Sequence, residues 1–193
     1  MKITIWNLKG GQGKTVLSLA LAMQYDFYVV TNDVHSPIDQ ILEDGKALRV
    51  GNNESLPDVP EELNLIYDFG GYPDHRVIEA AKKSKFVIIP IIYGSALEMQ
   101  VTINAISEIE EYTNNIIIIA NKCSKGDFER VRETLSKFYQ YPIFEIKSST
   151  AFSKSIDKKM SLGELIKSNP LFGYHYKKPL QQLEEVMNFI SKD

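Results

Sequence analysis

Apolar residues follow two alternating patterns along the chain. Short, nearly continuous apolar runs cover residues 2–7, 27–31, 63–68, 86–91, 115–121 and 143–146. Between them, apolar residues recur at helical spacing over residues 14–25, 37–43, 75–83, 96–112, 127–139 and 179–191. Continuous apolar runs are typical of strands buried on both faces, as in parallel sheets covered by helices. The alternation predicts an α/β fold with a doubly wound, mostly parallel sheet flanked by helices.

Residues 45–60 are the least regular segment, with glycines at 45 and 51 and prolines at 57 and 60. We expect a short strand near residues 47–50 and loop elsewhere in this segment. The chain of 193 residues is long enough for one sizeable core and short for two. We therefore expect a single domain over residues 1–193.

Composition narrows the class of protein only slightly. Hydrophobic residues make up 44% of the chain, and its net charge of −3 gives no general attraction to nucleic acid, so DNA contact would need a local patch. The single cysteine, Cys123, rules out an internal disulfide, and its place after an apolar run predicts a buried structural thiol. No segment reaches the roughly 18 apolar residues of a membrane span. Because the start also lacks a signal-peptide layout, we expect a cytoplasmic protein with no separate DNA-reading domain ahead of the first strand.

Residues 9–15 read Lys-Gly-Gly-Gln-Gly-Lys-Thr and lie between the first apolar run and the first helical pattern. A glycine-rich turn at this place presents backbone N–H groups at a helix N-terminus, and a Gly-Lys-Thr ending is typical of phosphate loops. We expect Lys14 to contact the β- and γ-phosphates and Thr15 to supply a hydroxyl to Mg²⁺. The predicted nucleotide-binding residues are Gly10, Gly11, Gln12, Gly13, Lys14, Thr15 and Val16. The usual G-x-x-x-x-G-K-[ST] pattern would need glycine where this chain has Leu8; instead, Lys9 heads the loop.

Later strands of the predicted sheet end in three polar residues: Asp33, Asp68 and Asn121. Ligands of such sheets bind at the edge formed by these strand ends. Asp68, followed by Gly70 and Gly71, is expected to hold Mg²⁺ directly or through a water, unless it caps a turn. Asp33 either orients an attacking water or helps to hold the metal, or it caps the next helix. The nearby His35 is a further polar group, with a structural or a catalytic role.

The glycine loop resembles the deviant Walker A motif, K-G-G-x-G-K-[ST], of the ParA/MinD ATPases. Residues 87–90 (Val-Ile-Ile-Pro) resemble the family's apolar strand that ends in proline. Residues 146–149 and 151–155 resemble the segment after its last core strand. The match covers nearly the whole chain in order, and the short form is similar to the small ParA proteins of plasmid partition. The resemblance implies a slow, partner-stimulated ATPase with ATP and Mg²⁺ as cofactors.

The resemblance also assigns a role to Lys9. In this family, the lysine that heads the loop crosses the interface of an ATP-sandwich dimer and contacts the phosphates bound by the other subunit. A cation delivered in this way stabilises charge on the transferred phosphoryl group, as an arginine finger does. Lys9 is therefore expected to be catalytic in a homodimer, together with Lys14 and Asp33.

The chain departs from the family after its second strand. ParA proteins typically carry D-x-D-P-Q there, whereas residues 32–37 read Asn-Asp-Val-His-Ser-Pro. If Asp33 matches the first family aspartate, His35 occupies the catalytic position; if Asp33 matches the second, Thr31 occupies the first. We favour Asp33 as the water-orienting residue. The departure also suits slow hydrolysis, as expected of a timer.

Residues 121–124 resemble the start of the guanine-reading N-K-x-D motif, but Ser124 replaces its aspartate. A carboxylate at that position would pair with the N1 and N2 donors of guanine, so its absence favours adenine. Asn121 is the predicted base contact.

Partners follow from the resemblance rather than from composition. It implies an ATP-dependent dimer that binds nonspecific DNA, associates with the nucleoid, and hydrolyses ATP when a centromere-binding partition protein stimulates it. The DNA contacts would come from lysines 154, 158, 159, 177 and 178. The last helix carries Glu184 and Glu185 opposite an apolar face, which favours packing on the sheet over membrane binding. The alternatives are a MinD-like positioning ATPase acting on membrane or a protein scaffold, and a metabolic ATP-dependent enzyme.

Overall fold

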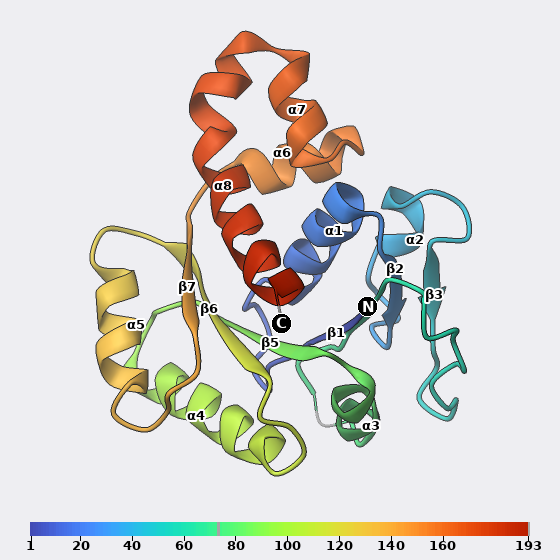
Figure 1. The fold of residues 1–193 in the computed structure, drawn as a ribbon, viewed down its shortest axis with the longest axis vertical. Coiled ribbons are helices and arrows are strands. Elements are labelled where there is room, and N and C mark those ends of the chain that lie inside the picture. The colour runs from blue at the N-terminus through green and yellow to red at the C-terminus, as the bar shows by residue number, and fades with distance from the viewer. Residues whose placement is uncertain (73, 193) are drawn as a thin grey trace.

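The computed structural model describes residues 1–72 and 74–192. Within these residues, seven strands form one sheet in the order β3-β2-β4-β1-β5-β6-β7, and every neighbouring pair is parallel (Figure 1). The predicted parallel α/β sheet is therefore confirmed. The strands are β1 (Lys2–Ile5), β2 (Tyr28–Thr31), β3 (Ala47–Arg49), β4 (Leu65–Asp68), β5 (Phe86–Ile91), β6 (Ile116–Cys123) and β7 (Ile143–Lys147).

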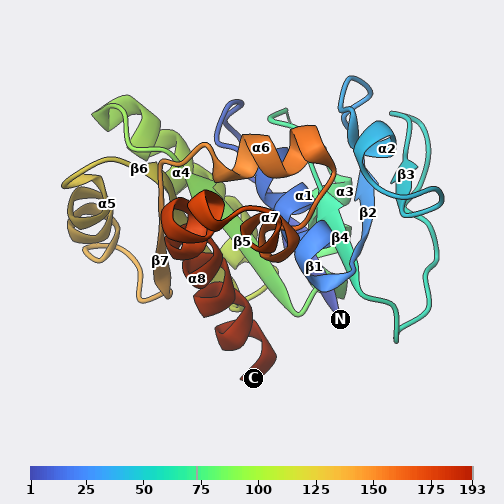
Figure 2. The same cartoon turned by 90° about the horizontal axis from the view of Figure 1, so that it is seen from above.

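Helices cover both faces of the sheet (Figures 1 and 2). One face packs against α1 (Lys14–Tyr25), α6 (Ala151–Lys158), α7 (Leu162–Ser168) and α8 (Pro170–Lys192), and the single turn α2 (Ile38–Ile41) contributes Ile38 to the same cluster. The opposite face packs against α3 (Arg76–Lys83), α4 (Ala96–Glu110) and α5 (Asp127–Leu135).

The apolar run of β6 shows why the sequence has this form. Ile117 and Ile119 belong to the first core cluster, whereas Ile116 and Ile118 belong to the second. Successive side chains of a strand point to opposite faces, so a strand covered on both sides needs apolar residues throughout. Cys123, at the end of this strand, is buried as predicted, and its thiol donates to the carbonyl of Ala120. Burial raises the pKa of this thiol to about 12.

The C-terminal part of the chain differs from the sequence prediction. The last helix was expected to begin at residue 179, but α8 begins at Pro170 and continues through Pro179 to Lys192. Its predicted apolar face does pack on the core, with Leu183, Val186 and Ile190 buried. Proline inside a helix lacks an N–H donor and its ring crowds the carbonyl four residues earlier, which disfavours the helix locally. Pro179 and Tyr176 are both buried, so packing opposes this cost.

Two short helices, α6 and α7, were not predicted. Neither is long enough to show a clear apolar periodicity, and their stability comes from packing on α1 and α8. The start of α7 does carry a local signal, because Ser161 and Glu164 form a capping box. Among the described helices, none combines the length and the apolar character that crossing a bilayer requires.

Candidate functional site

The loop between β1 and α1 needs glycine at the positions where its backbone turns. Gly11 and Gly13 have φ values of +76° and +81°, in the left-handed region that favours glycine. A Cβ atom on Gly13 would lie 2.4 Å from Nδ2 of Asn121, and one on Gly71 would lie 2.6 Å from the backbone nitrogen of Gly10. The loops after β1 and β4 and the end of β6 therefore pack in direct contact at one edge of the sheet.

Lys14, the first residue of α1, is buried, and its Nζ donates to the backbone carbonyl of Lys9 at 2.9 Å. Burial lowers the pKa of this ammonium, while the nearby carboxylates of Asp68 and Asp33 oppose that shift. The loop therefore folds around its own buried cation. Phosphate oxygens are the natural replacement for the carbonyl of Lys9, because the positive end of α1 also favours an anion here.

Lys9 is oriented by two contacts outside the loop. Its backbone N–H donates to Oδ1 of Asn7, and its ammonium forms an ion pair with Glu98 in the first turn of α4. Glu98 also caps that helix by accepting from the backbone of Ser95. Glu98 is not among the site residues predicted from sequence, although the capping-box spacing of Ser95 and Glu98 is a signal that marks the helix start.

The end of β4 places a buried carboxylate behind the loop. Oδ2 of Asp68 accepts from the hydroxyl of Thr15 and Oδ1 accepts from that of Ser18, both at 2.9 Å. Burial raises the pKa of Asp68 to about 6, although both hydroxyl bonds and Lys14 oppose the rise. Ser18, one helical turn after Thr15, was not predicted as part of the site.

The donor set around Asp68 fits Mg²⁺ rather than a metal bound by the protein alone. In the described part of the chain, no group of three or more His, Cys, Asp or Glu side chains could hold a metal ion. Thr15 and Asp68 offer one hydroxyl and one carboxylate. Mg²⁺ accepts such a sparse set, because it keeps several waters and takes further oxygens from bound phosphates.

A pocket of about 330 Å³ opens over the glycine loop. Asp33 lines it, half-buried, opposite Gly70 and Gly71, together with residues 10–16 and Lys122. His35 is exposed and does not line this pocket, and the buried Thr31 accepts a hydrogen bond from the backbone of Asp33. Of the three alternatives at the end of β2, only Asp33 faces the loop.

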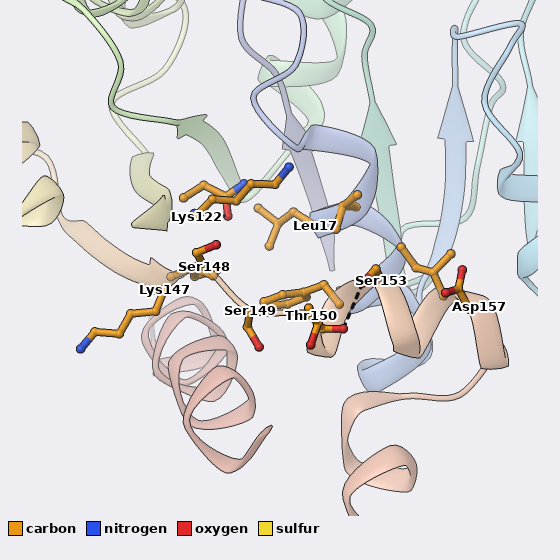
Figure 3. Close-up of a pocket in the computed structure, with 13 residues that line it drawn as sticks. Leu17, Lys122, Lys147, Ser148, Ser149, Thr150, Ser153 and Asp157 are labelled. Carbon is orange, nitrogen blue, oxygen red and sulfur yellow. Dashed lines mark hydrogen bonds between the residues drawn. The ribbon is translucent and has the colours of Figure 1, made fainter. Parts of the chain in front are cut away.

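A larger, more apolar pocket of about 560 Å³ adjoins the first, and the two share Val16 and Lys122 (Figure 3). Its walls come from the start of α1, the end of β6, and the segment from β7 into α6, including Leu17, Asn121, Ser148, Thr150, Phe152 and Ile156. The resemblance pointed to this last segment, but only the tertiary structure brings it beside the glycine loop.

Asn121 lines the larger pocket and supports the loop. Its Nδ2 donates to the carbonyl of Gln12 at 2.9 Å, and its Oδ1 accepts from the backbone of Lys122. The side chain of Gln12 in turn accepts from the backbone of Ile92. The loop is thus tied to β5 and β6, while a contact of Asn121 with a base stays a prediction.

Comparison with known proteins gives a match in structure only. No protein-family model matches the sequence, and no curated protein does. Among solved structures, a Cyanothece McdA–ATP complex superposes with a TM-score of 0.65 at 14% identity, covering 95% of this chain and 96% of that one. Pyrococcus horikoshii MinD with Mg-ADP gives 0.63 at 14% identity, covering 96% and 95%. A putative plasmid partition protein of Borrelia burgdorferi bound to AMPPNP gives 0.58 at 12% identity, covering 95% and 98%.

The chain has the ParA/MinD ATPase fold. The superpositions extend over nearly the full length of both chains, and this chain contributes seven parallel strands with helices on both faces. The neighbours include both MinD and plasmid-partition proteins, so the fold alone does not choose between these two roles. In this ParA/MinD fold, the structure brings Lys14, Thr15, Asp33 and Asp68 together at one edge of the sheet, with Asn121 beside them.

Proposed function

We propose that this chain is a ParA-type ATPase for plasmid or chromosome partition. The observation that carries the proposal is the single site in which Lys14, Thr15, Asp68 and Asp33 surround a pocket over the glycine loop. The solved structures with the same fold include complexes with ATP, Mg-ADP and AMPPNP. These ligands support a nucleoside triphosphate as the substrate.

Each residue of the site would have a separate role in ATP hydrolysis. Lys14 exchanges the carbonyl of Lys9 for β- and γ-phosphate oxygens, and the backbone N–H groups of residues 10–16 hold the remaining phosphate charge. Thr15 and Asp68 would hold Mg²⁺, which supplies charge neutralisation on the phosphates. Asp33 orients a water whose oxygen bonds to the γ-phosphorus as the bond to the β-phosphate oxygen breaks, giving ADP and phosphate.

Adenine is the base that the larger pocket suits. Leu17, Phe152 and Ile156 give the pocket apolar walls against which a purine and its ribose can pack. Position 124, where a guanine-reading motif has aspartate, is serine. Asn121, which lines this pocket and donates to the carbonyl of Gln12 in the loop, would contact the base.

Lys9 supports a dimer in which each subunit completes the other's site. Its ammonium is paired with Glu98 in the isolated chain, and Lys9 does not line the phosphate pocket. Lys9 would leave Glu98 and contact phosphates bound by a second copy. A hydrolysis rate set by dimer formation fits a switch better than a metabolic enzyme.

The proposed function includes binding to DNA and to a partition protein. Lys154, Lys158 and Lys159 are exposed on α6 and at its end, while Lys177 and Lys178 are exposed on α8. A local lysine patch of this kind would bind phosphates of any sequence, and the affinity would fall steeply with salt. A centromere-binding protein would stimulate hydrolysis and release the dimer from the nucleoid.

Three measurements on the purified chain test the proposal. ATP turnover with Mg²⁺, together with an ATP-dependent gel shift of random duplex DNA that high salt abolishes, supports the partition role. ATP-dependent sedimentation with liposomes, with no DNA shift, would replace it by a MinD-like positioning role. ATP turnover by a chain that stays monomeric and requires a small metabolite would overturn both the partition role and the positioning role.

A further inference from the structure

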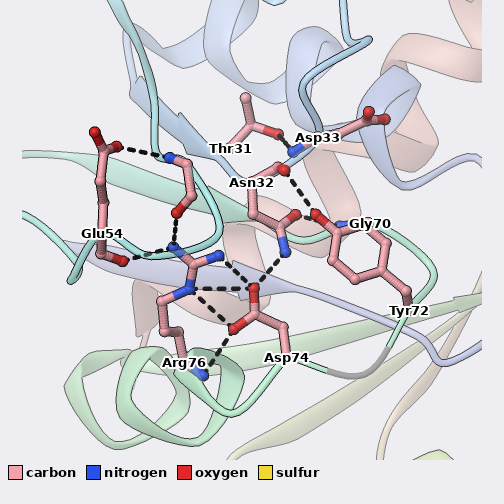
Figure 4. Close-up of polar contacts among 9 residues, drawn as sticks. Thr31, Asn32, Asp33, Glu54, Gly70, Tyr72, Asp74 and Arg76 are labelled. Atoms are coloured by element: carbon pink, nitrogen blue, oxygen red, sulfur yellow. Dashed lines mark hydrogen bonds and ion pairs between the residues drawn. The ribbon is translucent and has the colours of Figure 1, made fainter.

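A buried polar network lies next to the phosphate pocket and joins four segments of the chain (Figure 4). At its centre is Asn32, the first residue after β2, which is only 1% exposed. Its Oδ1 accepts from the backbone N–H of Gly70, and its Nδ2 donates to Oδ2 of Asp74, both at 2.7 Å. Its backbone carbonyl accepts from the hydroxyl of Tyr72, also at 2.7 Å. One asparagine thus holds the segment after β4 at three points.

The network continues through a buried ion pair. Asp74 and Arg76 pair at 2.6 Å with side chains that are 5% and 4% exposed. Nη1 of Arg76 donates to the carbonyls of Gly51 and Glu54, so the loop after β3 is tied in as well. Although burial works to raise it, hydrogen bonds from Arg76 and Asn32 hold the pKa of Asp74 at about 2.

This network has the position of a spacer between the two walls of the phosphate pocket. Asn32 precedes Asp33 on one wall, and Gly70, which it binds, is itself on the other wall beside Gly71. Asn32 does not line the pocket. A buried ion pair adds little net stability because both charges lose their water, but a fully hydrogen-bonded network makes its surroundings rigid.

We propose that Asn32 is a positioning residue for phosphoryl transfer, which sets the separation between Asp33 and the Gly70–Gly71 turn through its bonds to Gly70 and Asp74. This inference rests on the proposed ATPase function. An amide is required because the side chain must accept from Gly70 and donate to Asp74 at the same time. A carboxylate at position 32 would keep the first bond and face the charge of Asp74 with no donor.

The chemistry of the pair suggests a reciprocal swap as the test. Asn32→Asp alone and Asp74→Asn alone each break the donor–acceptor match. The double variant Asn32→Asp/Asp74→Asn re-forms the bond between positions 32 and 74, because the new amide donates to the new carboxylate. Oδ1 at position 74 still accepts from the backbone N–H and Nε of Arg76, but the oxygen that accepts from Nη2 of Arg76 is lost. Asn32→Ala and Tyr72→Phe remove, respectively, the whole side chain and one donor to the carbonyl of Asn32.

Steady-state ATP turnover and ATP affinity are measured for all variants. We expect kcat to fall at least about tenfold in Asn32→Ala and Asn32→Asp, with affinity changed by less than about threefold, because small misplacement of reacting groups slows chemistry more than binding. The double variant is expected to recover part of the lost kcat, because the bond between positions 32 and 74 is re-formed, and Tyr72→Phe is expected to lose less kcat than Asn32→Ala. Leu135→Ala, at the buried last residue of α5, is the control: we expect it to destabilise the fold to a similar or larger degree without changing kcat.

The outcomes separate this inference from the function on which it rests. An inactive wild-type chain overturns both. An active wild type with unchanged kcat in Asn32→Asp, or a folded double variant that stays as slow as Asn32→Asp, overturns the positioning role alone. Equal losses of kcat in Asn32→Ala and Leu135→Ala would also overturn it, because general destabilisation would then account for the effect.

Discussion

Nζ of Lys14 donates to the backbone carbonyl of Lys9 at 2.9 Å, so the two lysines of the glycine loop are joined by a direct hydrogen bond. The ammonium of Lys14 is buried, and leaving a buried charged donor without an acceptor costs free energy of folding. Phosphate binding at Lys14 and release of the backbone at Lys9 are therefore parts of one exchange. This link connects nucleotide binding to the lysine that pairs with Glu98.

Replacing Lys14 with alanine should abolish useful nucleotide binding. Charge-assisted hydrogen bonds contribute about 1.5–3 kcal/mol, and about 1.4 kcal/mol corresponds to tenfold in affinity, so we expect a loss of about one to two orders of magnitude for each phosphate contact. Isothermal titration with ATP and Mg²⁺ measures this loss. Lys137→Ala, an exposed lysine just after α5, is the matched control and should bind as the wild type does. Unchanged affinity in Lys14→Ala would contradict the placement of the phosphates.

Variants of Lys9 and Glu98 should separate nucleotide binding from assembly. Lys9→Ala is expected to bind ATP yet fail to dimerise or hydrolyse, because Lys14 and the backbone N–H groups remain in place. Glu98→Gln removes the charge that holds Lys9 but keeps the ability to cap α4, so more ATP-bound dimer is expected. Sedimentation velocity with a non-hydrolysable ATP analogue measures both effects. Normal dimers of Lys9→Ala would remove the role given to Lys9.

Two glycines of the loop should respond differently to alanine. Gly13→Ala forces a side chain into a left-handed conformation, at a cost of about 1–2 kcal/mol, and places its Cβ against Asn121. We expect lower thermal stability and weaker nucleotide binding. At Gly10 an added Cβ meets nothing within 4 Å, so Gly10→Ala should leave the melting temperature nearly unchanged. Equal stability of the two variants in thermal denaturation would be inconsistent with this loop geometry.

The pKa of Asp68 predicts how stability depends on pH in the absence of nucleotide. In the folded chain the pKa is about 6, above the unfolded value of 3.8, so the unfolded state ionises first as pH rises. This carboxyl therefore favours the folded state below about pH 4, and that contribution is lost between about pH 4 and 6, by up to about 3 kcal/mol. Urea denaturation at pH 4.5 and 7.5 should show a smaller difference for Asp68→Asn than for the wild type. An identical difference in both proteins would show that Asp68 does not titrate in this range.

Local sequence patterns were sufficient to predict the parallel sheet and α1. Runs such as residues 86–91 have one plausible environment, a strand covered on both faces, and the glycine turn marks both the end of β1 and the start of α1. Prediction failed where stability depends on packing between distant segments. The first turns of α8 and the short helices α6 and α7 hold together through contacts with α1 and with one another, which local spacing does not report.

The sequence by itself determined the sheet, the glycine loop and the strands that end in polar residues. These features depend on backbone conformation and on the burial pattern, and both follow from neighbouring residues. Only the tertiary structure decided which side chains share the site. It placed Asp33 rather than His35 on the phosphate pocket, paired Lys9 with Glu98 of α4, and joined Asn32 to Asp74. These relationships depend on how strand ends far apart in sequence meet at one edge, and the geometry of that edge is set by the packing of the whole sheet.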